Sequence, residues 1–210
     1  MSTDSSRTTS TRVAILEAAV ELFLERTDKP DDIKMVDIAK RAGVSRRSLY
    51  VHFGSRTGLL VAMVQHFDAG GILQGLVRQV VEAPTSLDAL DAIVLLHAEY
   101  SPVAYPVARV LMLGRHEDDA LAAAWNDRME ARRDVYASVV DRLNRDGLIS
   151  RSWNVRAATD MVWALTSWQV WEQLVVDQGW SKERYRKYLG IALHRMLIRR
   201  RGEPTGPGVS

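Results

Sequence analysis

Apolar residues recur at steps of three and four positions along most of this chain, which is the spacing of helices with one buried face. The first such segment runs from residue 11 to residue 25, and its apolar stripe consists of Val13, Leu16, Val20 and Phe23. From residue 71 to residue 201 the pattern predicts five or six more helices and no convincing strand. The expected fold class is therefore all-α.

The stretch from Met35 to Leu60 divides into a short helix, a tight turn, a second short helix and the start of a third. Gly43 stands where the first of these helices needs a left-handed residue in order to end. Ser45 is a strong N-cap for the next helix, and Val44 and Leu49 occupy the flanking positions of a hydrophobic staple. Two helices joined by a short glycine-containing turn form a helix-turn-helix.

The second helix of this motif has two faces. Leu49 and Phe53 lie four residues apart and point inward. The outward side and the first turn carry Arg46, Arg47, Ser48, Tyr50 and His52. In a helix-turn-helix these N-terminal positions reach base edges in the major groove, where arginine binds guanine through two hydrogen bonds. No acidic residue occurs from Ile38 to Phe67, as a phosphate-facing surface requires. The alternative is a solvated basic face on a small three-helix unit.

The run IAKRAGVSRRSLYVHFGSRTGLL resembles the DNA-binding signature of the TetR family of bacterial transcriptional repressors. The family pattern is a helix, A-G-V-S, a few variable residues, L-Y-x-H-F, a short turn, and a basic residue before an apolar helix. The segment 11–25 is similar to the first helix of the family. This resemblance implies an N-terminal three-helix helix-turn-helix DNA-binding domain, followed by a larger C-terminal helical domain for ligand binding and dimerisation.

The resemblance also extends the candidate DNA site, with departures from the family pattern. Lys34 stands where a Thr or Ser usually caps the second helix and contacts phosphate, and Val36 stands where a residue able to reach DNA is often found. Arg56 occupies the place of a phosphate-binding lysine. Arg46, Arg47 and Ser48 are expected to read bases, and Tyr50, His52, Lys34 and Arg56 are expected to contact mostly phosphates, whereas Val36 offers only an apolar contact. The full candidate set is Lys34, Val36, Ser45, Arg46, Arg47, Ser48, Tyr50, His52 and Arg56.

The expected organisation has four parts: a disordered N-terminal tail over 1–10, the DNA-binding domain over 11–55, the helical ligand-binding and dimerisation domain over 56–201, and a flexible tail over 202–210. Ser55 caps the helix that opens the second domain, and a break is expected near Gly70-Gly71. Further helices are expected over 86–100, 102–114, 118–144, 154–178 and 181–200.

The last two of these helices are apolar on more than one side, so each needs a second covering surface. By the resemblance, these two helices pair with the same two from another copy, and the homodimer presents two recognition helices to half-sites about one helical turn apart. The alternative is a larger monomeric core. The candidate interface residues are Val170, Leu174, Tyr185, Leu189, Leu193 and Met196.

Aromatic and methionine side chains gather on helices that are expected to surround one centre. They are Tyr105, Met112, His116, Trp125, Met129, Trp163, Trp168 and Trp171. Such a lining suits a small hydrophobic or aromatic effector, although each residue taken alone is equally compatible with plain core. No histidine pair has metal-ligand spacing, so neither a metal nor a cofactor is expected.

Composition excludes several other classes of protein. The chain has 210 residues, a formal net charge of +2 and no cysteine, so it has no disulfide framework and no thiolate site. No apolar run reaches the ~20 residues of a membrane span and the N-terminus lacks a signal-peptide core, so we expect a cytoplasmic protein without a membrane partner. Phosphate-loop, nucleophile-elbow and zinc-protease motifs do not occur.

The sequence therefore predicts a ligand-responsive transcriptional regulator, a repressor that binds a pseudo-palindromic operator in double-stranded DNA as a dimer and is not an enzyme. Two alternatives stay open at this point. One is an architectural DNA-binding protein without a ligand, and the other is an all-helical enzyme that uses the C-terminal aromatic residues as its active-site pocket.

Overall fold

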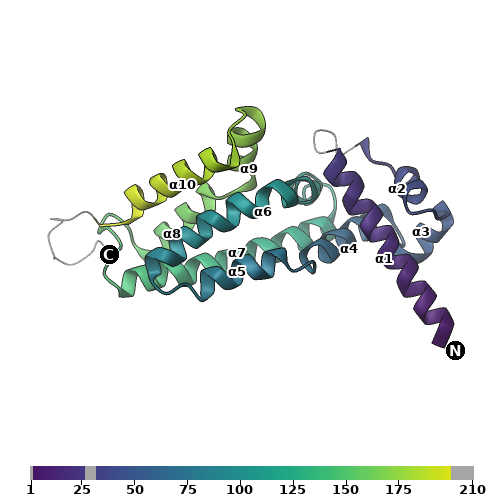
Figure 1. The fold of residues 1–210 in the computed structure, drawn as a ribbon, viewed down its shortest axis with the longest axis horizontal. Helices are drawn as coiled ribbons and strands as arrows, with labels where there is room; N and C mark the ends of the chain where they lie inside the picture. The colour runs from purple at the N-terminus through teal and green to yellow at the C-terminus, as the bar shows by residue number, and fades with distance from the viewer. Residues whose placement is uncertain (1, 27–31, 200–210) are drawn as a thin grey trace. The chain divides into compact units, whose positions relative to one another are not determined.

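The computed structural model describes residues 2–26 and 32–199, and these residues are almost entirely helical (Figure 1). This confirms the all-α fold class. The elements are α1 (Ser2–Glu25), α2 (Met35–Arg41), α3 (Arg46–Phe53), α4 (Arg56–Asp68), α5 (Ile72–Val81), α6 (Ser86–Gly114), α7 (Asp119–Arg145), α8 (Val155–Leu165), α9 (Trp168–Trp171), the π-helix η2 (Glu172–Asp177) and α10 (Lys182–Leu197).

The chain folds into two compact units. One contains Met1–Gly71 and Val103–Asp127, and the other contains Ile72–Pro102 and Arg128–Ser210. Helices α6 and α7 each contribute one part to each unit. The first unit therefore holds the helix-turn-helix together with the end of α6, the beginning of α7 and the corner that joins them.

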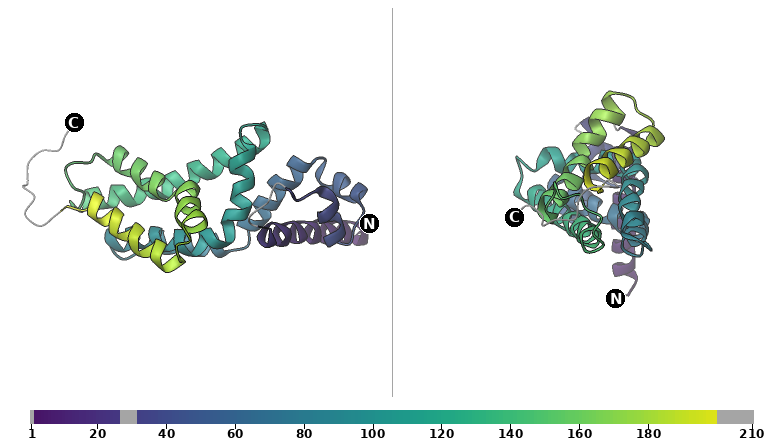
Figure 2. Two further views of the ribbon diagram at one scale, coloured as in Figure 1. Left: turned by 90° about the horizontal axis from the view of Figure 1, so that it is seen from above. Right: turned by 90° about the vertical axis from the view of Figure 1, so that its left-hand side faces the viewer.

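Helices α1 to α4 form the predicted helix-turn-helix bundle within the first unit. Helix α1 lies against α2 and α4, and α3 contacts both α2 and α4 (Figures 1 and 2). Each helix contributes fully buried apolar side chains to one core; they include Ile15, Phe23, Ile38, Leu49, Leu59 and Met63. This core fixes the face of α3 that carries Leu49, so the opposite face is left to solvent.

Helix α1 is longer than the sequence predicted. It begins at Ser2 instead of near Thr11, so residues 2–10, expected as a disordered tail, are helical here. No glycine or proline occurs before Pro30, and adding residues to an existing helix costs much less than nucleating one. The predicted flexible tail at 202–210 lies outside the described residues.

The turn between α2 and α3 has the predicted form. Gly43 has φ +66°, its N–H donates to the Lys40 carbonyl, and the Val44 N–H donates to the Ala39 carbonyl. These two bonds make a Schellman cap at the end of α2. The Ser45 hydroxyl then accepts the Ser48 N–H at 3.1 Å and caps α3. Two adjacent caps set the direction of α3 relative to α2.

The step from α3 to α4 depends on Gly58. The Ser55 hydroxyl accepts the Gly58 N–H at 3.0 Å, which confirms the predicted cap. In the structure, a Cβ at Gly58 would lie 2.2 Å from the carbonyl oxygen of Phe53. Glycine is therefore required there, because the end of α3 approaches the first turn of α4 at backbone distance.

The predicted break after α4 is confirmed. Helix α4 ends at Asp68, Gly71 has φ +90°, and α5 begins at Ile72. Among the described residues, no single helix has the length and apolar character to cross a membrane. Only α4 and α5 taken together reach that length and apolar character, and they are bent by 53° at the break between them.

Two helix boundaries in the C-terminal region differ from the prediction. Helix α6 runs unbroken through Pro102 and Pro106, where we predicted two helices. The residues after Pro102 are mostly buried, including Tyr105 and Leu111, so packing offsets the loss of backbone hydrogen bonds at the prolines. The predicted helix over 154–178 is instead divided into α8, α9 and η2.

The end of α8 shows why that helix divides. The Thr166 hydroxyl bonds back to the Val162 carbonyl at 2.7 Å, and the Ser167 hydroxyl caps a new helix by accepting the Val170 N–H. Both side chains compete with the helical backbone in this way. Helix α10 lies against α8 and η2 (Figures 1 and 2). An antiparallel bridge between Ile149 and Ile198 follows the end of α10.

Candidate nucleic-acid interface and interior polar cluster

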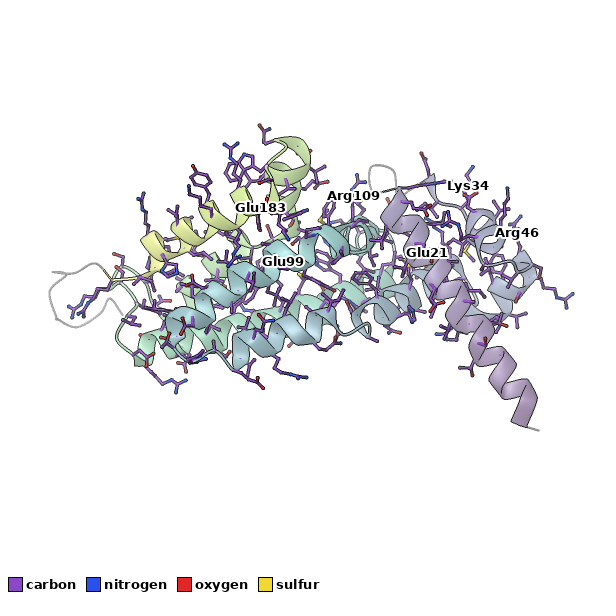
Figure 3. The ribbon with its side chains drawn as sticks, viewed as in Figure 1. Glu21, Lys34, Arg46, Glu99, Arg109 and Glu183 are labelled. Carbon is purple, nitrogen blue, oxygen red and sulfur yellow. The ribbon has the colours of Figure 1, made fainter. Side chains whose placement is uncertain are left out.

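Arg46 and Arg47 form the exposed first turn of α3. Both side chains are exposed, and neither makes a hydrogen bond or ion pair with any residue that the structure describes. Figure 3 shows Arg46 on the outer side of α3. The N-terminus of α3, where both residues lie, adds the partial positive charge of the helix dipole. This turn therefore presents two uncompensated guanidinium groups, as a base-reading helix requires.

The other predicted residues of α3 lie around this turn. Tyr50 is 44% exposed and Val51 is more exposed still, so the outward face of α3 carries an aromatic and an apolar side chain as well as cations. Ser48 and His52 are half-buried. The Ser45 hydroxyl is already used as the cap of α3, so its structural role is to position that helix.

Lys34 and Val36 frame the start of α2, and both are exposed. The start of α2 is closed by Asp37, whose carboxylate accepts the Lys34 N–H at 3.0 Å. Asp37 stands three residues after the N-cap position, which is the usual place for this bond, so the signal was present in the sequence. The ammonium group of Lys34 stays available to a phosphate.

Two other cations of the basic segment are held by the protein itself. Arg41 binds Glu25 through two hydrogen bonds of 2.9 and 2.6 Å and also contacts Glu21, and its hydrogen bonds lower the pKa of the Glu25 carboxyl. Arg56 is half-buried and donates from Nη1 to the Ile33 carbonyl at 2.5 Å. Arg56, predicted to contact phosphate, therefore has a structural role at the start of α4, with its remaining donors left for DNA.

Arg12 holds the other end of α3. Its guanidinium lies 4.6 Å from the centre of the Phe53 ring and donates to the His52 carbonyl at 3.3 Å. A cation at the C-terminal carbonyls of a helix is favourable. The recognition helix is thus fixed by Ser45 at its start and by α1 at its end.

The eight predicted effector-lining residues divide between the two units. Tyr105, Met112, His116 and Trp125 are in the first unit, and Met129, Trp163, Trp168 and Trp171 are in the second. His116 is exposed, whereas Trp168 and Trp171 are buried. In the first unit, the Arg115 guanidinium lies 4.8 Å from the Trp125 ring. In the second, Trp168 packs against Tyr100 and Trp171 against Tyr185.

A cluster of polar side chains, which sequence reasoning missed, lies inside the second unit. It joins Arg132 and Tyr136 of α7 to His97 of α6 and to Thr166, which directly follows α8. Arg132 Nε donates to the Tyr136 hydroxyl at 2.9 Å, and Nη2 donates to the Thr166 hydroxyl at 2.8 Å and to the Trp163 carbonyl at 2.7 Å. We call these four residues, His97, Arg132, Tyr136 and Thr166, the interior polar cluster.

His97 is the buried end of this cluster, and its Nε2 contacts the Tyr136 hydroxyl. Burial, and secondarily the charge of Arg132, lowers the pKa of His97 well below its ordinary value, so its imidazole is neutral at neutral pH. The Tyr136 hydroxyl thus contacts Arg132 Nε on one side and His97 Nε2 on the other. The one formal charge of the cluster is that of Arg132.

The six predicted dimer residues differ in exposure. Tyr185, Leu189 and Leu193 are buried in the chain's own core. The apolar periodicity of α10 predicts that the helix has buried faces, but it does not show which of them packs against the chain's own core. Val170, Leu174 and Met196 are half-buried. The exposed apolar residues of α10 are instead Tyr188 and Ile191.

No group of three or more possible metal ligands occurs among the residues that the structure describes. The structure therefore gives no candidate metal centre in that part of the chain. Fold and site together define an all-helical protein with an N-terminal helix-turn-helix whose second helix presents free arginines.

Comparison with known proteins gives the family. Residues 15–63 match the sequence model of the tetR family of bacterial regulatory proteins. The same fold occurs in a transcriptional regulator from Saccharomonospora viridis solved with choline (TM-score 0.79, 17% identity, 91% of this chain and 100% of that one). It also occurs in FadR from Bacillus subtilis solved with stearoyl-CoA (TM-score 0.68, 19% identity, 86% and 96%).

A third similar structure is NalD, the secondary repressor of the MexAB-OprM multidrug efflux pump in Pseudomonas aeruginosa (TM-score 0.63, 21% identity, 93% of this chain and 100% of that one). No curated protein matches the chain. The matched segment covers α2, α3, the C-terminal part of α1 and most of α4, and the solved structures share the fold over most of the chain. The helix-turn-helix segment of this chain therefore matches the tetR family of bacterial regulatory proteins, and the chain as a whole shares the fold of these solved structures.

Proposed function

We propose that this regulator is a repressor which binds a pseudo-palindromic operator as a homodimer and releases it when a small hydrophobic or aromatic effector binds the C-terminal region. Residues 11–55 would form the DNA-binding domain, and residues 56–201 would bind the effector and the second copy. The protein would act in the cytoplasm. The observation that carries it is the exposed, uncompensated pair Arg46 and Arg47 on a helix held at both ends.

The outward face of α10 supports a dimer. Tyr188 and Ile191 are 47% and 37% exposed, and the Trp180 ring lies 5.5 Å from that of Tyr188. Large apolar side chains grouped on one surface are typical of an interface. We propose that a second copy covers this face, with Tyr188 and Ile191 in place of the buried residues first assigned.

The similar structures do not select one effector. One holds choline, a cation, and another holds stearoyl-CoA, an acyl thioester. The role of NalD as a repressor supports a repressor here without naming the ligand. Repression follows if the dimer occupies DNA that polymerase needs, and release follows if the effector favours a second arrangement of the helices.

A selection from genomic DNA, followed by mobility shift and sedimentation, tests this proposal. We expect a defined fragment to bind two chains, with an affinity that falls steeply with salt and falls again when a matching compound is added. If every compound leaves affinity unchanged, an architectural protein is the better description. Turnover of a bound compound would favour an enzyme, and failure to prefer any fragment over bulk DNA would remove the proposal.

The coupling between effector and DNA has a candidate contact within the first unit. The Thr57 hydroxyl in the first turn of α4 donates to Asp118 Oδ2 at 2.6 Å, and Asp118 Oδ1 accepts the N–H groups of Ala120 and Leu121 at the start of α7. The bond from Thr57, with those from the α7 backbone, lowers the pKa of Asp118. A shift of α7 would therefore act on α4, directly after the recognition helix.

Replacing Thr57 by valine removes this hydrogen bond and keeps the side-chain shape. We expect operator affinity to change less than about twofold, whereas the effector concentration for half-release should shift about fivefold, because a coupling of about 1 kcal/mol is lost. Thr57→Ser, which restores the hydroxyl, is the control. Identical release curves for the valine and serine variants would show that this contact does not transmit the signal.

A further inference from the structure

We propose that the interior polar cluster binds an anion, so that the effector of this protein is an aromatic or apolar molecule carrying a carboxylate. This inference rests on the proposed function for the existence of an effector, and it adds the charge of that effector and the residues that recognise it. The structure points to it through Arg132, through an unpartnered hydroxyl on Tyr185, and through the exposure of the side chains around them.

Arg132 carries a charge that no acidic group balances. Its hydrogen-bond partners are a phenol, a hydroxyl, a backbone carbonyl and a thioether, and none is a carboxylate among the residues that the structure describes. It is half-buried, where a charge is more costly than in water. Asp160 forms its ion pair with the neighbouring Arg133 instead. An unbalanced guanidinium in such a place favours an anionic partner.

The geometry of Arg132 leaves one edge free for that partner. Nε and Nη2 are held by three hydrogen bonds of 2.7 to 2.9 Å, to Tyr136, Trp163 and Thr166. Nη1 has only the Met129 sulfur at 3.7 Å, which is a weak acceptor. The group is therefore rigidly oriented with its Nη1 donors available. A carboxylate oxygen would complete the coordination without displacing any of the three bonds.

Tyr185 supplies a second polar group with nothing to bind. Its side chain is completely buried, and its hydroxyl has no hydrogen-bond partner within the described part of the chain. Arg132 and Tyr136 are close enough to influence its ionisation, although burial is the main reason that its pKa is raised. A buried hydroxyl without a partner costs stability, so it is unusual in a finished core. It is available to donate to the same anion.

The surroundings suit the apolar part of such a ligand. The Trp163 ring lies 5.4 Å from the Arg132 guanidinium carbon, and the Tyr136 ring lies 5.2 Å from it. Met129, Arg132 and Trp163 are all half-buried, so each keeps part of its surface exposed. A flat apolar body beside Trp163 would keep its carboxylate at Nη1 and cover the half-exposed side chains.

The test measures binding to the purified full-length chain without DNA. The probes are 1-naphthoate, the neutral 1-naphthamide of the same shape, and the benzyltrimethylammonium cation, followed by calorimetry and quenching of tryptophan fluorescence. We expect naphthoate to bind at least about tenfold more tightly than the amide, because a hydrogen-bonded ion pair is stronger than a neutral contact. Equal or tighter binding of the amide or the cation, or no binding of naphthoate at millimolar concentration, overturns the proposal.

Variants separate recognition from a purely structural role. Arg132→Gln should lose the preference for naphthoate over the amide, whereas Arg132→Lys keeps the charge and should keep part of the preference. Arg133→Gln is the matched control, because Arg133 is the next residue of α7 and also contacts α8, through Asp160. If Arg132→Gln lowers the melting temperature but leaves the preference for the anion intact, Arg132 only caps α8 and the proposal fails.

The Tyr185→Phe variant tests the second polar group of the site without destabilising the protein. Removing an unpartnered hydroxyl should not lower the melting temperature of the free protein, yet it should weaken naphthoate binding about three- to tenfold. Unchanged naphthoate affinity in this variant removes Tyr185 from the site. These binding measurements do not involve the operator. If naphthoate binds through Arg132 but does not release DNA, that result contradicts the proposed function and leaves this inference standing.

Discussion

Replacing Arg46 or Arg47 by alanine is expected to weaken operator binding by about 1–3 kcal/mol, which is about 5- to 150-fold. Both side chains are exposed at the start of α3 and neither has a protein partner among the described residues. Their removal should therefore leave the fold intact, so the whole loss reports on DNA. Titration of the selected operator and of variants with single base changes provides the measurement.

The pattern of the loss identifies the role of each arginine. An arginine that reads guanine should also relax the preference at one position in each half-site, whereas a phosphate contact should weaken all sequences evenly and reduce the salt slope by about 1. Arg145→Ala is the control, because Arg145 is exposed on α7 and pairs with Asp141 four residues earlier. Operator affinity unchanged in both Arg46→Ala and Arg47→Ala would mean that α3 does not read DNA.

Gly58→Ala is expected to destabilise the protein by about 2–3 kcal/mol, although alanine is normally the better helix former. The reason is steric, since the new Cβ would lie 2.2 Å from the Phe53 carbonyl oxygen and backbone would have to move. Because Phe53 ends the recognition helix, the same shift should weaken operator binding. Urea denaturation of the full chain measures the first effect and DNA titration the second.

Gly75→Ala provides a control of opposite sign. Gly75 is exposed within α5, and no atom lies within 4 Å of the position where its Cβ would be. There alanine should stabilise the protein by up to about 1 kcal/mol. If Gly58→Ala also proves neutral or stabilising, the close approach between α3 and α4 does not constrain the protein.

Local signals made the helix-turn-helix predictable from the sequence. Gly43 and Ser45 act within a few residues of themselves, through a backbone conformation and a cap, and the structure has both as predicted. The break near Gly71 was predictable for the same reason. Where a backbone requirement is fixed by immediate neighbours, the sequence is sufficient to predict it.

Features that depend on distant contacts were not predictable. Pro102 and Pro106 indicate a break, but burial of the surrounding residues keeps α6 whole. Tyr185 and Leu193 have interface periodicity, but which stripe of α10 is covered depends on α8 and η2. Arg132 gave no signal, because its partners on α8 lie about thirty residues away along the chain. Periodicity shows that a face is apolar and does not show what covers it.

Two copies of α3 are expected to read the major groove, one in each half of a symmetric site. Methylation interference on the selected operator measures this, because dimethyl sulfate modifies guanine N7 in the major groove and adenine N3 in the minor groove. We expect interference at guanine N7 in two clusters about 10 base pairs apart, or a multiple of that distance. A single cluster, or interference confined to adenine N3, would contradict the claim.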